Sequence, residues 1–232
     1  MRRIELQPAF VVHARAYRDS SFLVDCFTPD YGRICAIARG VRRGKNNQRA
    51  LLNPFIPLLI SLQGKSSLKL LVSLESTGQR LHLTGVRLYS GLYLNELLLR
   101  VLSEWDSCPS LFQHYTAALR ALAGDTDIEL VLRRFEKHLL HELGYAIDWH
   151  CEANSEQALK PDAWYRLDVQ AGFIPVAPGA TGNCYMGAWL LDIARDQYSS
   201  PEVKKAAKHI SRTLLQPLLG DKPLQSRQLF LT

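Results

Sequence analysis

The residues best placed to do chemistry in this sequence are cations that lie close together in one glycine-containing stretch, from Ala38 to Arg49. Guanidinium groups bind phosphate oxygens through paired hydrogen bonds, and glycines allow a backbone to approach a ligand closely. Such a stretch can follow a nucleic-acid backbone without reading its bases. A solvated surface loop has the same composition, so the stretch alone leaves both interpretations open. The cations are Arg39, Arg42, Arg43, Lys45 and Arg49.

The charge around this stretch has one sign. No acidic residue occurs from Tyr31 to Leu74, whereas Arg33, Lys65 and Lys69 add further cations there. The whole chain has a formal net charge of +6 and a pI near 9.1. A basic excess concentrated in one part of the chain favours a polyanionic partner, and Arg33 joins the candidate nucleic-acid contacts.

A second group of cations is expected on one face of the last long helix. Its members recur at i, i+3 and i+4 positions, where helical side chains are neighbours. They would lengthen a nucleic-acid track, although charged faces of this kind are more often simply solvated. The sequence leaves both roles open for Lys204, Lys205, Lys208 and Arg212.

Aromatic side chains in the N-terminal region are candidate platforms for base stacking. Most of them are expected in the core. Tyr17 and Tyr31 lie beside turn sequences and are the better exposed candidates.

Enzymatic motifs are missing from the sequence. It has no P-loop, no G-x-G-x-x-G after a strand, no H-E-x-x-H and no nucleophile elbow. His138 and His141 lie near Glu136 and Glu142 on an expected helix, but this spacing also occurs on ordinary amphipathic helices. We therefore expect a protein that is not an enzyme and that uses no cofactor.

The composition is that of a globular chain. It has 232 residues, of which 47% are apolar, and its longest apolar run, Ala50 to Leu62, is too short and too interrupted to cross a bilayer. Glu5 and Gln7 stand where the apolar part of a signal peptide would begin. The five cysteines are scattered and odd in number, so no disulfide framework is implied. We expect a cytoplasmic protein with no membrane partner.

Residues 1–80 are predicted to form a small β-barrel domain. Short runs of strand-forming residues alternate there with turn sequences such as Pro29-Asp30-Tyr31-Gly32. Five strands with a long basic connection between the third and fourth fit an OB-fold, and an SH3-like barrel fits almost as well. The expected strands are Ala9–Tyr17, Ser21–Thr28, Arg33–Arg39, Phe55–Leu62 and Lys69–Glu75.

Residues 81–232 are predicted to form an α-helical domain, because apolar residues recur at helical spacing after Thr84-Gly85. The fold class is therefore α+β. Glycines and prolines interrupt the pattern between residues 149 and 187, which predicts a small irregular insertion of the hairpin or knuckle type. The expected helices are Val86–Trp105, Leu111–Ala123, Ile128–Leu143, Gly187–Gln197 and Pro201–Leu219.

A series of stretches is typical of one known family: Ala9-Phe10-Val11-Val12-His13, Gly32-Arg33, Ala38-Arg39-Gly40, Pro54-Phe55-Ile56-Pro57-Leu58, Leu88-Tyr89-Ser90-Gly91-Leu92-Tyr93-Leu94-Asn95-Glu96-Leu97-Leu98, Leu132-Arg133-Arg134-Phe135-Glu136, Leu143-Gly144-Tyr145 and Lys222-Pro223-Leu224-Gln225-Ser226-Arg227. Each stretch is weak by itself, but their order and spacing are specific. From about Ala9 to Phe230 the chain resembles the RecO family of recombination mediators.

The resemblance implies an N-terminal OB-fold, followed by helices, in a DNA repair protein of the RecF pathway. It implies binding of single- and double-stranded DNA, annealing of complementary strands coated with single-stranded DNA-binding protein, and a nucleoid-associated location. It also implies partnership with RecR in loading RecA, with RecF as a further candidate partner, and no nucleotide hydrolysis. The alternative is a generic OB-fold nucleic-acid module, perhaps directed to RNA, without mediator activity.

The resemblance further implies that the helical region captures the acidic, apolar C-terminal tail of single-stranded DNA-binding protein. We assign this role to Arg133, with Arg134 or Lys137 assisting, because a guanidinium can pair with a terminal carboxylate. The alternative for Arg133 is an internal salt bridge with Glu129 or Glu136.

The sequence departs from part of the family in its irregular segment. Some members carry a four-cysteine zinc knuckle there, whereas this chain has only Cys151 and Cys184 and no C-x-x-C pair. His150 cannot complete a set of four ligands. We therefore expect no structural zinc.

Overall fold

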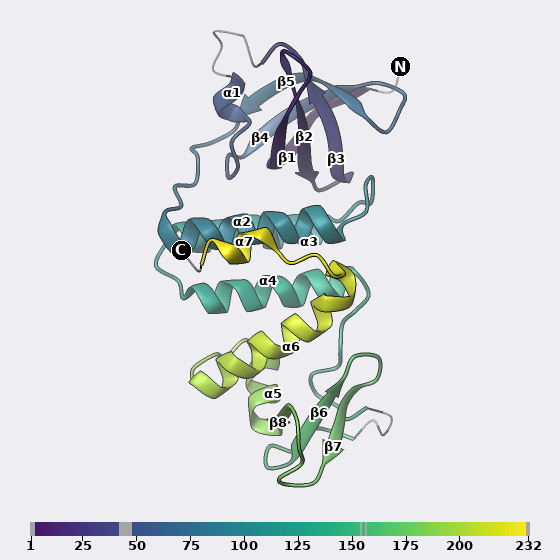
Figure 1. Ribbon diagram of the computed structural model, residues 1–232, viewed down its shortest axis with the longest axis vertical. Coiled ribbons are helices and arrows are strands. Elements are labelled where there is room, and N and C mark those ends of the chain that lie inside the picture. The colour runs from purple at the N-terminus through teal and green to yellow at the C-terminus, as the bar shows by residue number, and fades with distance from the viewer. Residues whose placement is uncertain (1–2, 42–47, 154, 156, 231–232) are drawn as a thin grey trace. The chain divides into compact units, whose positions relative to one another are not determined.

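The computed structural model describes residues 3–41, 48–153, 155 and 157–230 (Figure 1). The chain forms two compact units. Unit 1 comprises Met1–Thr126 with Asp221–Thr232, and unit 2 comprises Asp127–Gly220. Among the described residues, no helix is both long enough and apolar enough to span a membrane.

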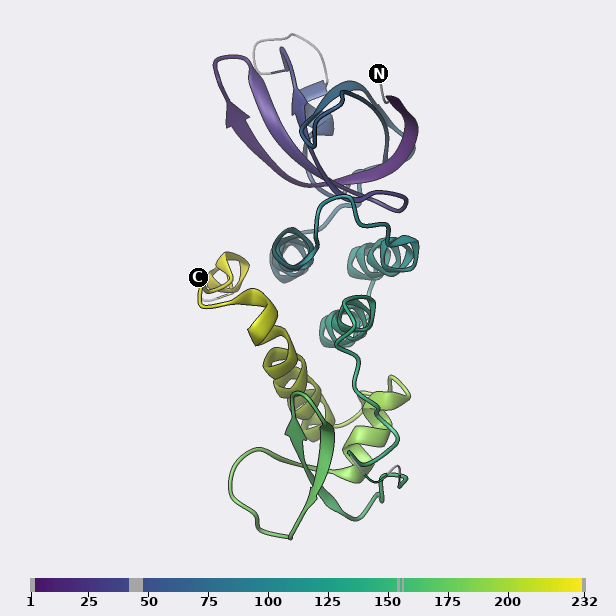
Figure 2. The same cartoon turned by 90° about the vertical axis from the view of Figure 1, so that its right-hand side faces the viewer.

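The first part of unit 1 is a closed five-stranded barrel with the strand order β1-β2-β3-β5-β4, which Figure 2 shows nearly end-on. β3 and β5 run parallel, whereas all other neighbours are antiparallel. The strand order and the parallel β3–β5 pair are those of an OB-fold, so they confirm this prediction against the SH3-like alternative. The strands are β1 (Arg3–Tyr17), β2 (Ser21–Thr28), β3 (Gly32–Ala38), β4 (Leu58–Gln63) and β5 (Lys69–Ser76), with the short helix α1 (Gln48–Leu51) between β3 and β4.

The barrel interior is filled by alternating apolar side chains, as the period-two pattern of the strands requires. In β3, for example, Ile34 and Ala36 are fully buried while Cys35 and Ile37 are only partly covered. Cys26 also lies in this core. Burial, with a smaller effect of the neighbouring Asp25, raises the pKa of its thiol to about 12, so Cys26 behaves as a small hydrophobic residue.

Three helices complete unit 1: α2 (Gly85–Val101), α3 (Pro109–Ala123) and α7 (Gln225–Gln228). α2 ends four residues before the predicted Trp105, whose φ of 66° is incompatible with a continuing helix. The loop after α2 pairs instead with the start of β3. Trp105 N donates to Arg33 O over 3.1 Å, and Cys108 N donates to Pro29 O over 3.0 Å.

The barrel and the helices of unit 1 meet around Asn95, a buried residue of α2. Its Nδ2 donates to the carbonyl of Val12 over 3.1 Å, and its Oδ1 accepts from the Tyr115 hydroxyl over 2.5 Å. Val12 lies where a bulge interrupts the β1–β2 pairing, so its carbonyl is turned away from the regular ladder. Aromatic rings surround this point, with Phe10 and Phe27 from the barrel packed against Phe112 and Tyr115 from α3.

The end of the described chain returns to α2 (Figure 1). Glu96 accepts hydrogen bonds from the backbone N–H groups of Gln225 and Ser226 and from the Ser226 hydroxyl, at 2.9, 2.8 and 2.6 Å. Arg100 donates to the carbonyls of Lys222 and Pro223. These contacts join two of the stretches on which the family resemblance was based.

Unit 2 combines three helices with a small sheet. The predicted insertion is a three-stranded sheet in the order β7-β6-β8, with an antiparallel β6–β7 hairpin. Side-chain oxygens of Asp127 and Ser200 cap the first turns of two helices, as these residue types commonly do. The elements are α4 (Ile128–Glu142), β6 (Trp164–Asp168), β7 (Gly172–Val176), β8 (Cys184–Met186), α5 (Gly187–Ala194) and α6 (Pro201–Leu219).

The predicted boundary between residues 80 and 81 stays a prediction. The division into compact units differs from this boundary, because α2 and α3 pack on the barrel and belong to unit 1. The barrel itself nevertheless ends with β5 at Ser76, close to the predicted end of the first domain.

Replacing Asn95 with Leu should destabilise the protein by about 2–4 kcal/mol, because the buried carbonyl of Val12 and the Tyr115 hydroxyl both lose their bonds to the amide. Urea unfolding followed by circular dichroism measures this change. Leu99, a partly exposed residue one turn further along α2, provides the control variant Leu99→Ala, which should cost less. A loss below about 0.5 kcal/mol in N95L would contradict the role given to Asn95.

Candidate nucleic-acid interface and ligand pocket

The basic loop after β3 is described only at its two ends. Arg39 and Arg49 are exposed there. Arg42, Arg43 and Lys45 lie outside the described residues, so their part in phosphate binding stays a prediction.

The outer face of β1, β2 and β3 carries further cations beside this loop. In the register of the barrel, Arg15 lies next to Leu23, and Leu23 lies next to Ile37. Arg15 and Arg18 are exposed, whereas Leu23 and Ile37 are half-buried. This face therefore combines exposed positive charge with partly covered apolar surface, which suits a nucleic-acid strand.

Sequence reasoning did not select Arg15 and Arg18. The available signal was the alternation His13, Arg15, Tyr17, which places all three on one face of a strand.

Of the two stacking candidates, Tyr17 lies under Arg18, whose guanidinium carbon is 5.2 Å from the ring centre. Tyr31 packs edge-on against Trp105, with 6.1 Å between the ring centres, so its ring contributes to packing within unit 1.

Arg33 has internal partners. Its Nε donates to the carbonyl of Leu102 over 3.1 Å, and its Nη1 lies 3.3 Å from Asp25 and 3.4 Å from Glu104. These contacts fix the loop after α2 to the barrel. The phosphate-binding role predicted for Arg33 remains a prediction, and the geometry gives this side chain a structural role as well.

Lys69 is also turned inward, although it belongs to the acid-free part of the sequence. Only 7% of the residue is exposed. Its ammonium donates to the carbonyls of Gly64 and Ser66 over 3.2 and 2.7 Å and lies 4.7 Å from the centre of the Trp105 ring. Lys69 thereby shapes the loop between β4 and β5, on which Lys65 remains exposed.

The four cations of α6 differ in their partners. Lys204 lies 2.5 Å from Asp127, and Lys208 lies 3.5 Å from Glu129, so acidic residues at the start of α4 compensate both charges. Lys205 and Arg212 are exposed. The pairing favours a solvated helix face for the first two and leaves the predicted DNA contact of this group a prediction.

Arg133, predicted to bind a peptide tail, is buried on α4 with 7% of its surface exposed. Its Nη1 lies 2.8 Å from Oε2 of the fully buried Glu136, which is one of the two internal partners considered from the sequence. The pair is close but poorly aligned, because neither Nε nor Nη1 of Arg133 meets a hydrogen-bond acceptor among the described residues. Buried donors of this kind are costly unless a ligand or water uses them.

The two residues proposed to assist Arg133 hold the end of α5. Lys137 donates to the carbonyls of Ile193 and Ala194 and to Oδ1 of Asp196. Arg134 lies 3.5 Å from the same aspartate and is about half exposed.

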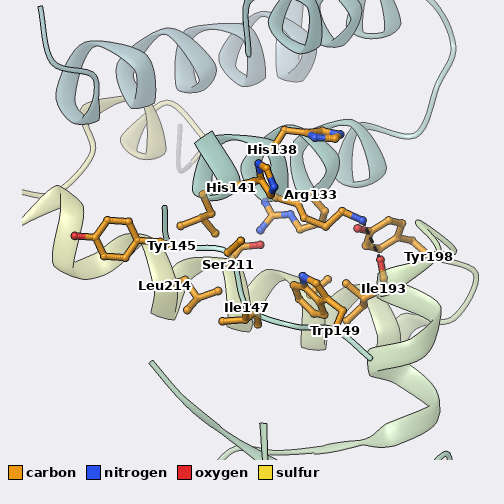
Figure 3. Close-up of a pocket in the computed structure, with 14 residues that line it drawn as sticks. Arg133, His138, His141, Tyr145, Ile147, Trp149, Ile193, Tyr198, Ser211 and Leu214 are labelled. Carbon is orange, nitrogen blue, oxygen red and sulfur yellow. Dashed lines mark hydrogen bonds between the residues drawn. The ribbon is translucent and has the colours of Figure 1, made fainter. Parts of the chain in front are cut away.

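Arg133 and Lys137 line a pocket of about 210 Å³ in unit 2 (Figure 3). Its described lining residues include four basic side chains and no acidic one. The Tyr198 hydroxyl is buried in the pocket wall and has no hydrogen-bond partner among the described residues. Arg133, Lys137, His138 and His141 supply the basic side chains, and Leu140, Ile147, Trp149, Ile193 and Leu214 supply apolar walls.

The pocket is suited to binding an anionic ligand with apolar side chains. Burial, followed by the neighbouring Asp196, raises the pKa of Tyr198, so its hydroxyl stays protonated and can donate. Sequence reasoning found Arg133 through the family resemblance but missed Tyr198 and Trp149. No spacing could reveal these residues, because the lining comes from three helices, the connection at residues 145–149 and the connection between α5 and α6, which contains Tyr198.

The described residues contain no cluster of three or more histidine, cysteine or acidic side chains that could hold a metal. Cys151 and Cys184 are partly covered thiols in unit 2. The expectation of no structural zinc remains a prediction that metal analysis of the purified protein would test.

Replacing Asp127 with Asn tests whether Lys204 serves the fold. Asn preserves an N-cap acceptor for α4 but removes the negative charge that pairs with Lys204. The hydrogen bond from Lys204 is the main cause that lowers the pKa of Asp127 below 3.8. The charged carboxylate therefore stabilises the fold above that pH, and this contribution disappears as the pH falls through the lowered pKa.

We expect the Tm of D127N to be about 1–3 °C lower than that of the wild type at pH 7, with the difference disappearing as the pH falls through the lowered pKa of Asp127. Thermal unfolding at several pH values measures it. Asp125→Asn, at an exposed site two residues earlier, is the matched control. Equal Tm values at pH 7 would show that the pair with Lys204 contributes nothing to the fold.

Comparison with known proteins identifies the family. The profile described as "Recombination protein O N terminal" matches residues 1–80, and "Recombination protein O C terminal" matches residues 82–228. Proteins named "DNA repair protein RecO" from Cellvibrio japonicus and Pseudoalteromonas atlantica are 47% and 43% identical to this chain. These alignments cover 98% and 95% of this chain, and 97% and 92% of the two relatives. A third, from Haemophilus influenzae, is 44% identical over 97% of this chain and 95% of its own length. The chain therefore belongs to the RecO family of DNA repair proteins.

Proposed function

We propose that this chain is a recombination mediator that binds single- and double-stranded DNA and anneals complementary strands without nucleotide hydrolysis. The carrying observation is the exposed positive charge on the barrel of unit 1. Arg15, Arg18 and Arg39 are exposed on or beside one barrel face, and Arg49 is exposed at the far end of the basic loop.

This arrangement provides a physical route to annealing. Two DNA strands repel each other over roughly 8 Å at physiological salt, and cations on a protein surface reduce that repulsion by displacing counterions from the phosphates. Contacts to phosphates leave the base edges free. Complementary bases can then pair while both backbones stay bound, so the process needs no fuel.

We infer that unit 2 directs this activity to coated DNA by capturing the C-terminal tail of single-stranded DNA-binding protein. The pocket around Arg133 supports this role, because it combines basic side chains with apolar walls. A peptide carboxylate would use the donors of Arg133 that lack an acceptor, and apolar side chains of the tail would replace water against Ile147, Trp149 and Leu214. In this proposal RecR then redirects the complex toward loading RecA, with or without RecF.

The proposal predicts faster annealing of complementary oligonucleotides that are precoated with the cognate single-stranded DNA-binding protein, in the absence of ATP. Stopped-flow fluorescence of labelled strands measures the rate with and without this protein. We expect a several-fold acceleration. Binding to DNA without any acceleration for coated strands would instead indicate a generic nucleic-acid module, which the barrel surface alone would explain.

The charge of the basic loop provides the control for this experiment. A variant with Arg39, Arg42, Arg43 and Lys45 changed to Ala should anneal more slowly. Its logarithmic dependence of single-strand affinity on salt should be shallower by about 3 if all four side chains contact phosphates. The double variant Lys205→Ala and Arg212→Ala tests in the same way whether α6 contacts phosphates. An unchanged salt dependence in both variants would place the DNA elsewhere.

Replacing Arg133 with Ala should weaken binding of a labelled tail peptide at least about tenfold, because a charged hydrogen bond is lost, while affinity for naked DNA stays within about twofold. Fluorescence anisotropy measures both affinities. Arg133→Lys preserves the charge next to buried Glu136 and guards against a folding defect. Arg166→Ala, at an exposed arginine of β6, is the control. Unchanged peptide affinity in R133A would exclude Arg133 from the tail site.

A further inference from the structure

The pocket of unit 2 contains a second polar group that the proposed tail site does not account for. Tyr198 lies in the wall with 8% of its surface exposed, and its hydroxyl has no hydrogen-bond partner among the described residues. A buried hydroxyl without a partner destabilises a folded protein, so native structures seldom leave one unused. Phe at this position would pack without this disadvantage.

Tyr198 and Arg133 lie at different places along the pocket. In Figure 3, Tyr198 lies with Ile193 and Trp149 toward one side of the pocket, Tyr145 and Leu214 lie toward the other, and Arg133 lies between them. A ligand that fills the pocket would therefore reach Tyr198 with a different part from the one that meets Arg133.

The charges around Tyr198 decide what kind of group it can bind. The carboxylates of Asp196 and Glu136 act on its hydroxyl, and they are offset by Arg133 and Arg134. Arg134 and Lys137 are already paired with Asp196. A carboxylate beside Tyr198 would lie next to the charge of Asp196, whereas a neutral carbonyl oxygen needs only the protonated hydroxyl that burial maintains.

We propose that Tyr198 is a specificity-determining residue of the tail site, whose hydroxyl donates a hydrogen bond to a peptide carbonyl oxygen of the ligand. The inference rests on the proposed function, because it concerns the same pocket. It assigns two anchors to one short peptide. Arg133 binds the anionic end of the peptide, and Tyr198 binds a neutral oxygen of the peptide backbone. The affinity of the pocket therefore depends on the backbone conformation of the peptide as well as on its charge.

The test uses the full-length protein and a fluorescent synthetic peptide with the C-terminal sequence of the cognate single-stranded DNA-binding protein. Tyr198→Phe removes one oxygen and preserves the ring. We expect the Kd of the peptide to rise about five- to tenfold, while the Tm of the free protein stays equal or increases because an unsatisfied hydroxyl has gone. A residue with a merely structural hydrogen bond would show the opposite pattern, with a lower Tm.

Tyr145→Phe is the matched control. Tyr145 lines the same pocket, but the residue is 45% exposed, so its hydroxyl can bind water in the free and bound states alike. The same chemical change should alter the Kd less than about twofold there. An equal rise in Kd for both variants would overturn the assignment to Tyr198.

A peptide whose C-terminus is an amide distinguishes the two anchors. Loss of the terminal charge should reduce the effect of Arg133→Ala, because that side chain then has no carboxylate to bind. The effect of Tyr198→Phe should remain the same for acid and amide peptides, since changes at independent contacts add. Coupling of Y198F to the terminal charge would overturn the carbonyl assignment.

The possible failures are separable. If the wild type does not bind the peptide, both the tail site and the role of Tyr198 are wrong. If the wild type binds and R133A is impaired, but Y198F binds with unchanged Kd, the tail site stands and the inference about Tyr198 is wrong.

Discussion

The amide of Asn95 joins three segments that are far apart in the sequence: the bulge of β1, helix α2 and helix α3. Each of its bonds is made in the core, where water cannot replace a lost partner. The bulge turns the carbonyl of Val12 out of the β1–β2 ladder and makes it available to α2. Because this contact and the aromatic rings beside it use the helix-facing part of the barrel, the face that bears Arg15 and Arg39 stays exposed.

Several basic side chains of this protein have a role in the fold. Arg33, Lys69 and Lys137 each donate hydrogen bonds to backbone carbonyls. These acceptors carry no charge, so a count of acidic residues in the sequence does not reveal them. Burial of the charge is tolerable because several oxygens replace the lost water. Arg133 differs, since its guanidinium has a single close carboxylate and donors without acceptors. The distinction between a structural and a ligand-binding cation therefore lies in the acceptors around it.

The alternation of apolar residues predicted the five strands, their helical spacing predicted the main helices, and the glycines and prolines of residues 149–187 predicted the insertion. It was less successful at boundaries. β1 begins at Arg3 and not at Ala9, because Leu6 adopts a positive φ of 49° in a bulge that breaks the alternation. α2 ends early because its last expected turn pairs with β3. The ligand pocket was beyond prediction, since its walls come from segments that only the tertiary fold brings together.

Because of the contacts of Glu96, unit 1 is complete only after unit 2 has been synthesised. Unit 1 uses residues 221–230, whereas all of unit 2 lies between residues 127 and 220. During synthesis on the ribosome, the barrel, α2 and α3 emerge first. The N–H groups that bind Glu96 belong to residues that are synthesised only after unit 2. A nascent chain that ends before residue 225 has all the residues of the barrel, α2 and α3 but lacks the N–H groups that Glu96 binds.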